Sequence, residues 1–323
     1  MSYAYVGCRT TKERNARGKC LKVFEINYKT GYWNLIQCLK TEEENPSYQT
    51  LDNEGNFLYY VHGDKTKVSS YKILEDGTLS PLNMIEIGGK NPVFITADRT
   101  NRFLVVAALQ GGAVYVIKRN EDGSLGEIVS ETHLPGKKEG TVSFAHQCIL
   151  DQTKTYLFVV TQGRIQGYGQ VLVYRFDAEN GTLTETDCFR SIEYDEPRHI
   201  AIHPNNRYAY LINEKGNKMT YFGFDAENGK LHARQNLPTL PETYTGEGQA
   251  SASLLDKNGK ILIGSNRIHE SIVLYRIDQE TGYMKELGYY PAMGLTPRFI
   301  TFNPDYSHFY MANEDSDTII EMK

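Results

Sequence analysis

A short apolar run that recurs seven times constrains this chain more than any other feature. Six of the copies follow a turn rich in Asp, Asn and Gly, which is typical of the connections between hairpin strands. The copies are four or five residues long and begin at Ala4, Phe57, Phe103, Tyr156, Tyr208, Ile261 and Phe309. A unit repeated this often predicts a repeat architecture rather than a fold with one asymmetric core.

Each apolar run is followed by a second run that alternates apolar and polar residues, as in 171–176 and 272–277. A glycine turn and a short further strand then complete several repeats, as in Asp76–Leu79. Four strands in a repeat in the mid-forties to mid-fifties in length match one propeller blade. No segment sustains a helical period. The sequence therefore predicts an all-β seven-bladed β-propeller, formed by residues 1–323 as one domain.

The number of strands leaves the closure of the ring open. The innermost strand of a blade is recognisable six times, and these strands begin near Pro46, Pro92, His146, Arg198, Ala250 and Arg298. The chain opens at the second strand of a blade and stops after a third strand, at 318–322. Two alternatives remain: a ring with two three-stranded blades, or a chain that is short at its C-terminus.

Composition excludes several classes of partner. A net charge of −5 disfavours a broad nucleic-acid interface, and no apolar run reaches the ~20 residues of a membrane helix. The N-terminal segment lacks the features of a secretory signal. The five cysteines are odd in number and widely spaced, with no Cys-x-x-Cys pair. We therefore expect reduced thiols, no zinc site, a cytoplasmic location and no partner that is nucleic acid or membrane.

Topology selects a small set of candidate site residues. The first two strands of a blade are antiparallel, so the start of each first strand and the end of each second strand lie on one rim. Proline occupies the shared position in the early repeats, but other residue types replace it later, which favours a site over scaffold. This rim also carries His62, Gln110, Gln162, Gln249, Asn313 and Glu314. The candidates for the site are His146, Arg198, His199, Arg298, Asn213, Glu214, Asn266 and Arg267.

One stretch resembles a known family. Residues 196–205, with the sequence Glu-Pro-Arg-His-Ile-Ala-Ile-His-Pro-Asn, and the following Tyr208–Glu214 are similar to the signature of seven-bladed propeller lactonases. That family includes propeller-type 6-phosphogluconolactonases and carboxy-cis,cis-muconate lactonizing enzymes. Ala145-His146, Asn266-Arg267 and Pro297-Arg298 support the resemblance. It implies that His146, Arg198, Glu214 and Arg267 are the catalytic residues.

Opening a lactone requires an activated water, stabilisation of an oxyanion, and a proton for the leaving alkoxide. Arginine binds phosphate or carboxylate groups with two parallel hydrogen bonds and stays charged, so we expect Arg198 and Arg267 to hold the substrate anion or the carbonyl oxygen. His146 and Glu214 are the candidate acid and base, in either order. Arg298, His199, Asn213 and Asn266 are expected to contact the substrate, without a metal or cofactor.

Three other functions remain as alternatives to hydrolysis of an anionic sugar lactone. The first is a lactonizing enzyme that acts on a carboxymuconate-type dicarboxylate. The second is a non-catalytic propeller that binds proteins, which the absence of Trp-Asp repeats disfavours. The third is a calcium-dependent lactonase, in which Glu214, Asn213 and Asn313 would supply oxygens but the arginines would oppose a cation.

Gly163–Gly169 lacks the ending of a phosphate loop and is expected to be a connection near the mouth. The oligomeric state stays open.

Overall fold

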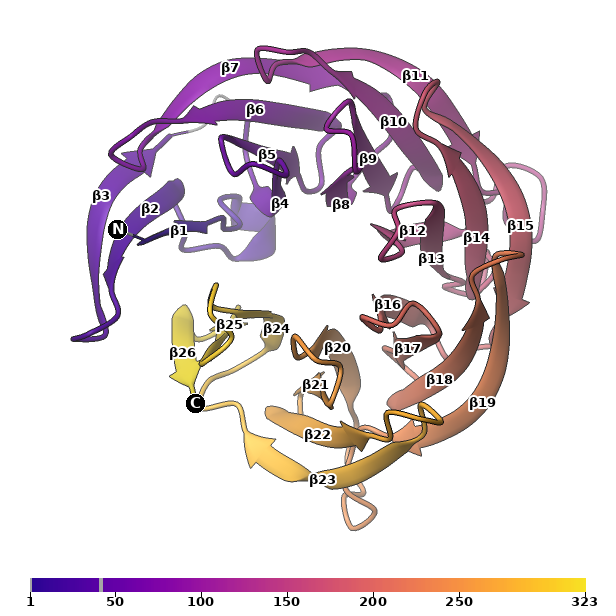
Figure 1. Cartoon of the computed structure of the whole chain (residues 1–323). Helices are drawn as coiled ribbons and strands as arrows, with labels where there is room; N and C mark the ends of the chain where they lie inside the picture. Colours follow the sequence, from indigo (N-terminus) through magenta and orange to yellow (C-terminus); the bar gives the residue numbers. More distant parts are fainter. Residues whose placement is uncertain (1, 41–42) are drawn as a thin grey trace. The chain divides into compact units, whose positions relative to one another are not determined.

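The computed structural model describes residues 2–40 and 43–323, and the chain there is almost entirely β-strand (Figure 1). The described residues contain 26 strands in seven sheets, and the single helix among them is a 3₁₀ turn, η1 (Lys12–Arg14). No helix in this described part is both long and apolar enough to cross a membrane. The absence of regular helix agrees with the all-β prediction.

The described residues belong to two units. The first contains residues up to 135 together with 144–148 and 176–183. Its strands are β1 (Ser2–Val6), β2 (Leu21–Asn27), β3 (Tyr32–Leu39), β4 (Pro46–Leu51), β5 (Phe57–His62), β6 (Lys67–Ile73), β7 (Leu79–Glu86), β8 (Pro92–Ala97), β9 (Phe103–Ala108), β10 (Ala113–Arg119), β11 (Leu125–His133) and the start of β12 (Phe144–Leu150). The prediction of one domain over the whole chain stays a prediction.

The second unit contains residues 136–143, 149–175 and 184–323. Its strands are β13 (Tyr156–Gln162), most of β14 (Gln170–Asp177) and β15 (Thr182–Arg190), β16 (Pro197–Ile202), β17 (Tyr208–Asn213), β18 (Lys218–Asp225), β19 (Lys230–Pro238), β20 (Gln249–Leu255), β21 (Ile261–Arg267), β22 (Ser271–Ile277), β23 (Met284–Pro291), β24 (Pro297–Phe302), β25 (Phe309–Asn313) and β26 (Thr318–Met322).

Consecutive strands pair antiparallel within a sheet, as in the order β16-β17-β18-β19 (Figure 1). The second strand of this sheet, β17, is buried along its whole length, because apolar clusters cover both of its faces. This is why the recurrent apolar run shows no alternation. The outer strand β19 is mostly exposed. Within the described residues, the first sheet (β1-β2-β3) and the last (β24-β25-β26) have three strands each.

The register of the second unit confirms the rim geometry predicted from the sequence. Pro197 at the start of β16 faces Asn213 at the end of β17. Gln249 in β20 faces Arg267 in β21 in the same way. The starts of first strands therefore meet the ends of second strands at one edge of each sheet.

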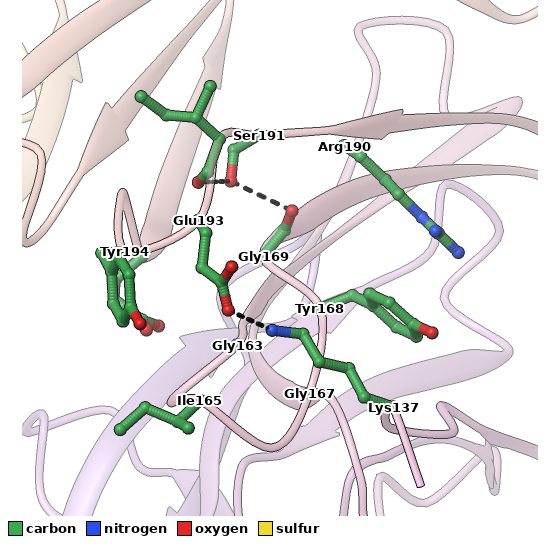
Figure 2. Close-up of a pocket in the computed structure, with 12 residues that line it drawn as sticks. Lys137, Gly163, Ile165, Gly167, Tyr168, Gly169, Arg190, Ser191, Glu193 and Tyr194 are labelled. Atoms are coloured by element: carbon green, nitrogen blue, oxygen red, sulfur yellow. Dashed lines mark hydrogen bonds and ion pairs between the residues drawn. The ribbon is translucent and has the colours of Figure 1, made fainter.

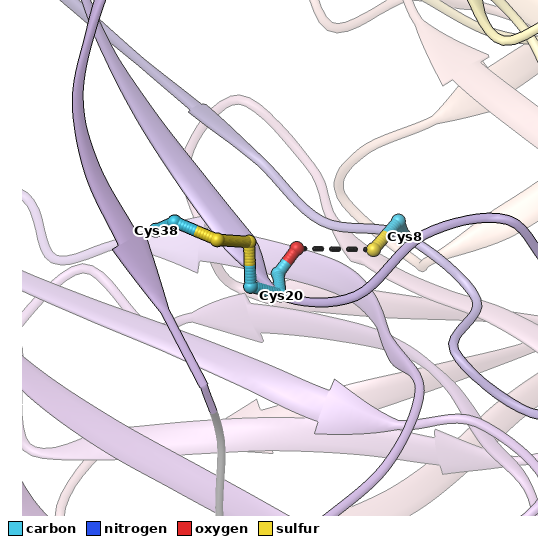
Figure 3. Close-up of a disulfide and its surroundings, with 3 residues drawn as sticks. All are labelled: Cys8, Cys20 and Cys38. Carbon is cyan, nitrogen blue, oxygen red and sulfur yellow. Dashed lines mark hydrogen bonds between the residues drawn. A yellow bond between two sulfur atoms is a disulfide. The ribbon is translucent and has the colours of Figure 1, made fainter.

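The expectation that all cysteines are reduced is wrong for two of them. Cys20 and Cys38 form a disulfide, and the Cys8 thiol donates a hydrogen bond to the Cys20 carbonyl oxygen at 3.0 Å (Figure 3). The pairing of β2 with β3 places Lys22 opposite Cys38, so the hairpin brings together two cysteines that are 18 residues apart. Cys148 and Cys188 are free, and burial raises the pKa of Cys148.

Candidate functional site

A single carboxylate oxygen organises the candidate site. Glu214 directly follows β17, and its Oε2 accepts a hydrogen bond from Gln162 Nε2 at 3.0 Å. Arg267 Nη2 lies 3.1 Å from the same oxygen and Arg198 Nε lies 3.4 Å from it. In the described part of the chain no donor lies on the other oxygen, Oε1. Glu214 is therefore held through its Oε2 atom.

A β-bulge places Arg198 in this cluster. Pro197 pairs with Asn213 and His199 pairs with Ile212, so Arg198 is an extra residue in β16. The same register shift follows Pro297 in β24, where Arg298 is the extra residue. A bulge turns its extra side chain away from the regular alternation of the strand. The bulge recurs between sheets and is therefore a feature of the scaffold, whereas the arginine side chain at the extra position is what contributes to the candidate site.

The cluster carries more positive than negative charge. Burial, together with the charges of Arg267 and Arg298, lowers the pKa of Arg198, which is 3% exposed. Burial also lowers the pKa of Arg267, although Glu214 opposes this shift. Arg298 is more exposed and pairs with Glu314 at 3.0 Å. Because one partly buried carboxylate faces two buried guanidinium groups, an anionic ligand would relieve their mutual repulsion.

Glu214 is held in its charged form. Burial by itself would raise the pKa of Glu214, but Arg267, Arg198 and the hydrogen bond from Gln162 lower it overall. A carboxylate with a depressed pKa is ionised at neutral pH.

His199 lies in the same buried region but carries no charge. Burial, Arg198 and Arg298 lower its pKa well below the usual value for histidine. Arg198 Nη1 lies 3.4 Å from each of its ring nitrogens. His199 therefore contacts the cationic cluster as a neutral ring, and its expected contact with substrate stays a prediction.

The two asparagines expected to bind substrate are held by hydrogen bonds within the protein. Asn213 is fully buried and its amide donates to the Lys218 carbonyl oxygen at 3.2 Å and to Thr220 Oγ1 at 3.0 Å. Asn266 is also fully buried and donates to the Thr239 carbonyl oxygen at 2.6 Å. Asn213 thus bonds within its own sheet, whereas Asn266 bonds to Thr239, which follows β19 of the preceding sheet. Their expected contact with substrate stays a prediction.

His146 belongs to the first unit, where it lies in β12 and is 6% exposed. The structure thus brings together Arg198, Glu214 and Arg267, with Arg298 within electrostatic reach. The participation of His146 in the same site stays a prediction.

Two residues of the cluster were not among the predicted site residues: Gln162 and Arg164. Arg164 donates to Gln162 Oε1 from Nε at 3.0 Å and from Nη2 at 2.8 Å. Gln162 lies on the rim predicted from the sequence, because it ends β13 at the position that Arg267 occupies at the end of β21. No pattern in the sequence indicates Arg164, which lies in a connection between strands.

That connection, Gly163–Gly169, borders a pocket of about 180 Å³ beside the site (Figure 2). It joins β13 to β14 with no helix after it, as expected for a connection rather than a phosphate loop. Lys137 pairs with Glu193 at 2.5 Å on one side of the pocket, and the Arg190 guanidinium lies 4.1 Å from the Tyr168 ring centroid. Gly167 is required, because a Cβ there would lie 2.4 Å from the Val142 carbonyl oxygen.

Metal ligands do not gather at this site. Among residues 2–40 and 43–323, no group of three or more His, Cys, Asp or Glu side chains could hold a metal ion. The arginines beside Glu214 would also repel a cation. The arrangement suits recognition of an anion next to a carboxylate base.

Comparison with known proteins identifies the family of this chain. The family described as "Lactonase, 7-bladed beta-propeller" matches residues 3–322. A 6-phosphogluconolactonase from Bacillus subtilis is 27% identical over 85% of this chain and 79% of its own length. One from Formosa agariphila is 27% identical over 98% of this chain and 90% of its own.

The solved structure of a periplasmic gluconolactonase from Pseudomonas aeruginosa has a TM-score of 0.87 to this chain, at 24% identity, and covers 99% of this chain and 92% of its own. This likeness confirms the predicted fold, a seven-bladed β-propeller. With the family matching almost every residue, the chain belongs to the seven-bladed β-propeller lactonase family.

Proposed function

We propose that this protein is a metal-independent lactonase that hydrolyses an anionic sugar lactone such as 6-phosphogluconolactone. The observation that carries the proposal is the buried cationic cluster around one ionised carboxylate. Relatives named 6-phosphogluconolactonase support a sugar lactone as substrate. These names give no support to the lactonizing alternative, and the excess of arginine opposes the calcium-dependent one.

In this proposal Glu214 is the general base. Its Oε1 takes a proton from a water, whose oxygen attacks the lactone carbonyl carbon. Arg198 and Arg267 keep N–H groups that are not directed at Glu214, and these stabilise the oxyanion or bind the substrate anion. The bond between the carbonyl carbon and the ring oxygen then breaks, and His146 supplies the proton to the leaving alkoxide. The arginines and Gln162 keep Glu214 ionised and so able to take a proton, although the same lowering of its pKa makes it a weaker base.

The location of the protein is a separate matter. The cytoplasmic location expected from the sequence stays a prediction. The Pseudomonas relative is named as periplasmic, and the Cys20–Cys38 disulfide would persist best in an oxidising compartment.

A lactone panel tests the proposal. Acid release above the spontaneous rate is followed with 6-phosphogluconolactone, with neutral gluconolactone and with a carboxylated lactone. We expect the phosphorylated substrate to be preferred. We also expect Glu214→Gln and His146→Ala each to lower kcat by about 10²–10⁴-fold, the usual contribution of a general acid or base. The proposal is wrong if no lactone is turned over faster than without protein, or if both variants keep full turnover.

A further inference from the structure

The starting observation is a chain of three side chains that ends on Glu214. Arg164 donates twice to the amide oxygen of Gln162, at 3.0 and 2.8 Å. The amide nitrogen of Gln162 donates to Glu214 Oε2 at 3.0 Å. Gln162 is 1% exposed, so its amide depends on these protein partners. Arg164 therefore acts on Glu214 through another residue.

The direction of the Gln162 amide follows from the chemistry of arginine. A guanidinium group has five donors and no acceptor, so only the amide oxygen can face it. The amide NH₂ group must then face Glu214. A donor to a carboxylate favours the ionised form of the carboxylate, whereas an acceptor in that position favours the protonated form. The side chain of Arg164 thus selects the amide orientation that keeps Glu214 charged.

The connection that carries Arg164 is tied down at its tip. The Arg164 backbone N–H donates to Glu196 Oε1 at 2.8 Å, and Gly167 N–H donates to the Gly163 carbonyl oxygen at 2.6 Å. Arg164 and Ile165 both have left-handed backbone angles, with φ of 43° and 72°. Such a conformation is unusual for a β-branched residue and persists only where the surroundings impose it. Glu196 is two residues from Arg198, so the connection is anchored beside the cluster.

We infer that Arg164 is a positioning residue, which orients the Gln162 amide so that Glu214 is fixed through Oε2 and presents Oε1 to the reacting water. The role of Oε1 rests on the proposed function, whereas the orientation of the amide does not. Arg164 is called a positioning residue because it acts on Glu214 through Gln162.

Several charged groups besides Arg164 lie near Glu214 and influence its pKa. Arg198 approaches from β16 and Arg267 from β21, and Arg298 acts from β24 at longer range. Gln162 approaches from β13, and Glu196 lies beside Arg164. Removing the Arg164 charge could itself affect Glu214, so a test must separate that direct effect from the orientation of the amide.

The test follows the protonation of Glu214 by its infrared carboxyl band, with Glu214→Gln as the blank. Arg164→Ala should raise the Glu214 pKa by about one unit, the size of one hydrogen bond. Gln162→Met should raise it by the same amount, and adding Arg164→Ala to Gln162→Met should raise it no further. Arg164→Lys retains a hydrogen-bond donor, so the Glu214 pKa in this variant should stay close to that of the wild type.

The matched control is Arg207→Ala, which removes an exposed arginine near the opposite end of β17 and should leave the Glu214 pKa unchanged. With 6-phosphogluconolactone as substrate, Arg164→Ala should shift the acid limb of the pH profile of kcat/KM to higher pH. It should also lower kcat about tenfold and leave KM little changed. Circular dichroism checks folding, and Arg164→Lys and Gln162→Met carry the test if Arg164→Ala does not fold.

Two results would overturn the inference. One is an unchanged Glu214 pKa in folded Arg164→Ala. The other is an equal shift from Arg164→Ala with and without Gln162, which would mean a direct effect of charge. Neither result depends on turnover. Failure of the proposed function would instead appear as an absence of lactone hydrolysis while the titration still behaves as described.

Discussion

Replacing Glu214 with glutamine should destabilise the folded protein in a manner that depends on pH. Glu214 is the partly buried carboxylate that faces both Arg198 and Arg267. The side chains of these arginines are 4% and 9% exposed, so water can replace little of the lost interaction. Glutamine keeps the shape of the side chain and one acceptor oxygen, but it leaves two guanidinium groups without their counter-charge.

The magnitude follows from these distances. At 3.1 and 3.4 Å, with an effective dielectric constant of about 20, each arginine attracts the carboxylate by about 5 kcal/mol. Desolvation of Glu214 cancels part of this attraction, and breaking a buried ion pair costs about 3–5 kcal/mol. Because glutamine keeps an acceptor oxygen, we expect the free energy of unfolding at pH 7 to fall by about 3 kcal/mol.

The pH dependence has a defined sign. The folded-state pKa of Glu214 is lower than its unfolded value, so its contribution is complete above the unfolded pKa of about 4.3. The contribution is lost as the pH falls through the lower, folded pKa. The difference between wild type and Glu214→Gln should therefore be constant from pH 7 to about 5 and shrink below about 4.

Urea unfolding at several pH values measures this difference, since urea does not screen charges as guanidinium does. Glu314→Gln is the matched control, because Glu314 pairs with Arg298, whose side chain is 37% exposed. That pair should contribute about 1 kcal/mol or less. The reasoning is refuted if Glu214→Gln is as stable as wild type at pH 7, or if its deficit persists unchanged below pH 4.

Three further predictions follow from the site and the fold. Arg198→Ala and Arg267→Ala should mainly raise KM for the phosphorylated lactone, since losing a charge-assisted pair costs about 2–5 kcal/mol; an unchanged KM in both would remove them from anion binding. Replacing Cys20 and Cys38 with serine should lower the free energy of unfolding by about 3 kcal/mol, because the closed loop of 18 residues is then freed in the unfolded chain; mass spectrometry without reductant should show the linked peptides, and free thiols there would contradict the pairing. Treatment with a chelator should leave lactone hydrolysis unchanged, and a loss that calcium restores would favour the calcium-dependent alternative.

Much of the fold could be predicted because its signals are local. Six first strands were expected near Pro46, Pro92, His146, Arg198, Ala250 and Arg298, and the observed strands begin within two residues of those positions. Turns and strands can be predicted from a few neighbouring residues, and the agreement between repeats strengthens each prediction. The same repetition identified the rim, since antiparallel pairing brings strand starts and strand ends together.

The candidate site was predicted only in part. Arg198, Glu214 and Arg267 stand where the repeats diverge, and the structure joins them. Asn213 and Asn266 stand one residue before Glu214 and Arg267, and their amides bond to protein groups: Asn213 bonds to Thr220 in its own sheet and Asn266 bonds to Thr239 after β19.

The sequence by itself determined the seven repeats, the antiparallel strands and the residues available at the rim, because periodicity and turn chemistry act between near neighbours. Only the tertiary structure decided which side chains meet. Strand register decides three features of this kind: the bulge at Arg198, the hydrogen bond between Gln162 and Glu214 across 52 residues, and the disulfide between Cys20 and Cys38. Register is set by packing between segments that are far apart in the chain, so it cannot be predicted from the pattern of neighbouring residues in the sequence.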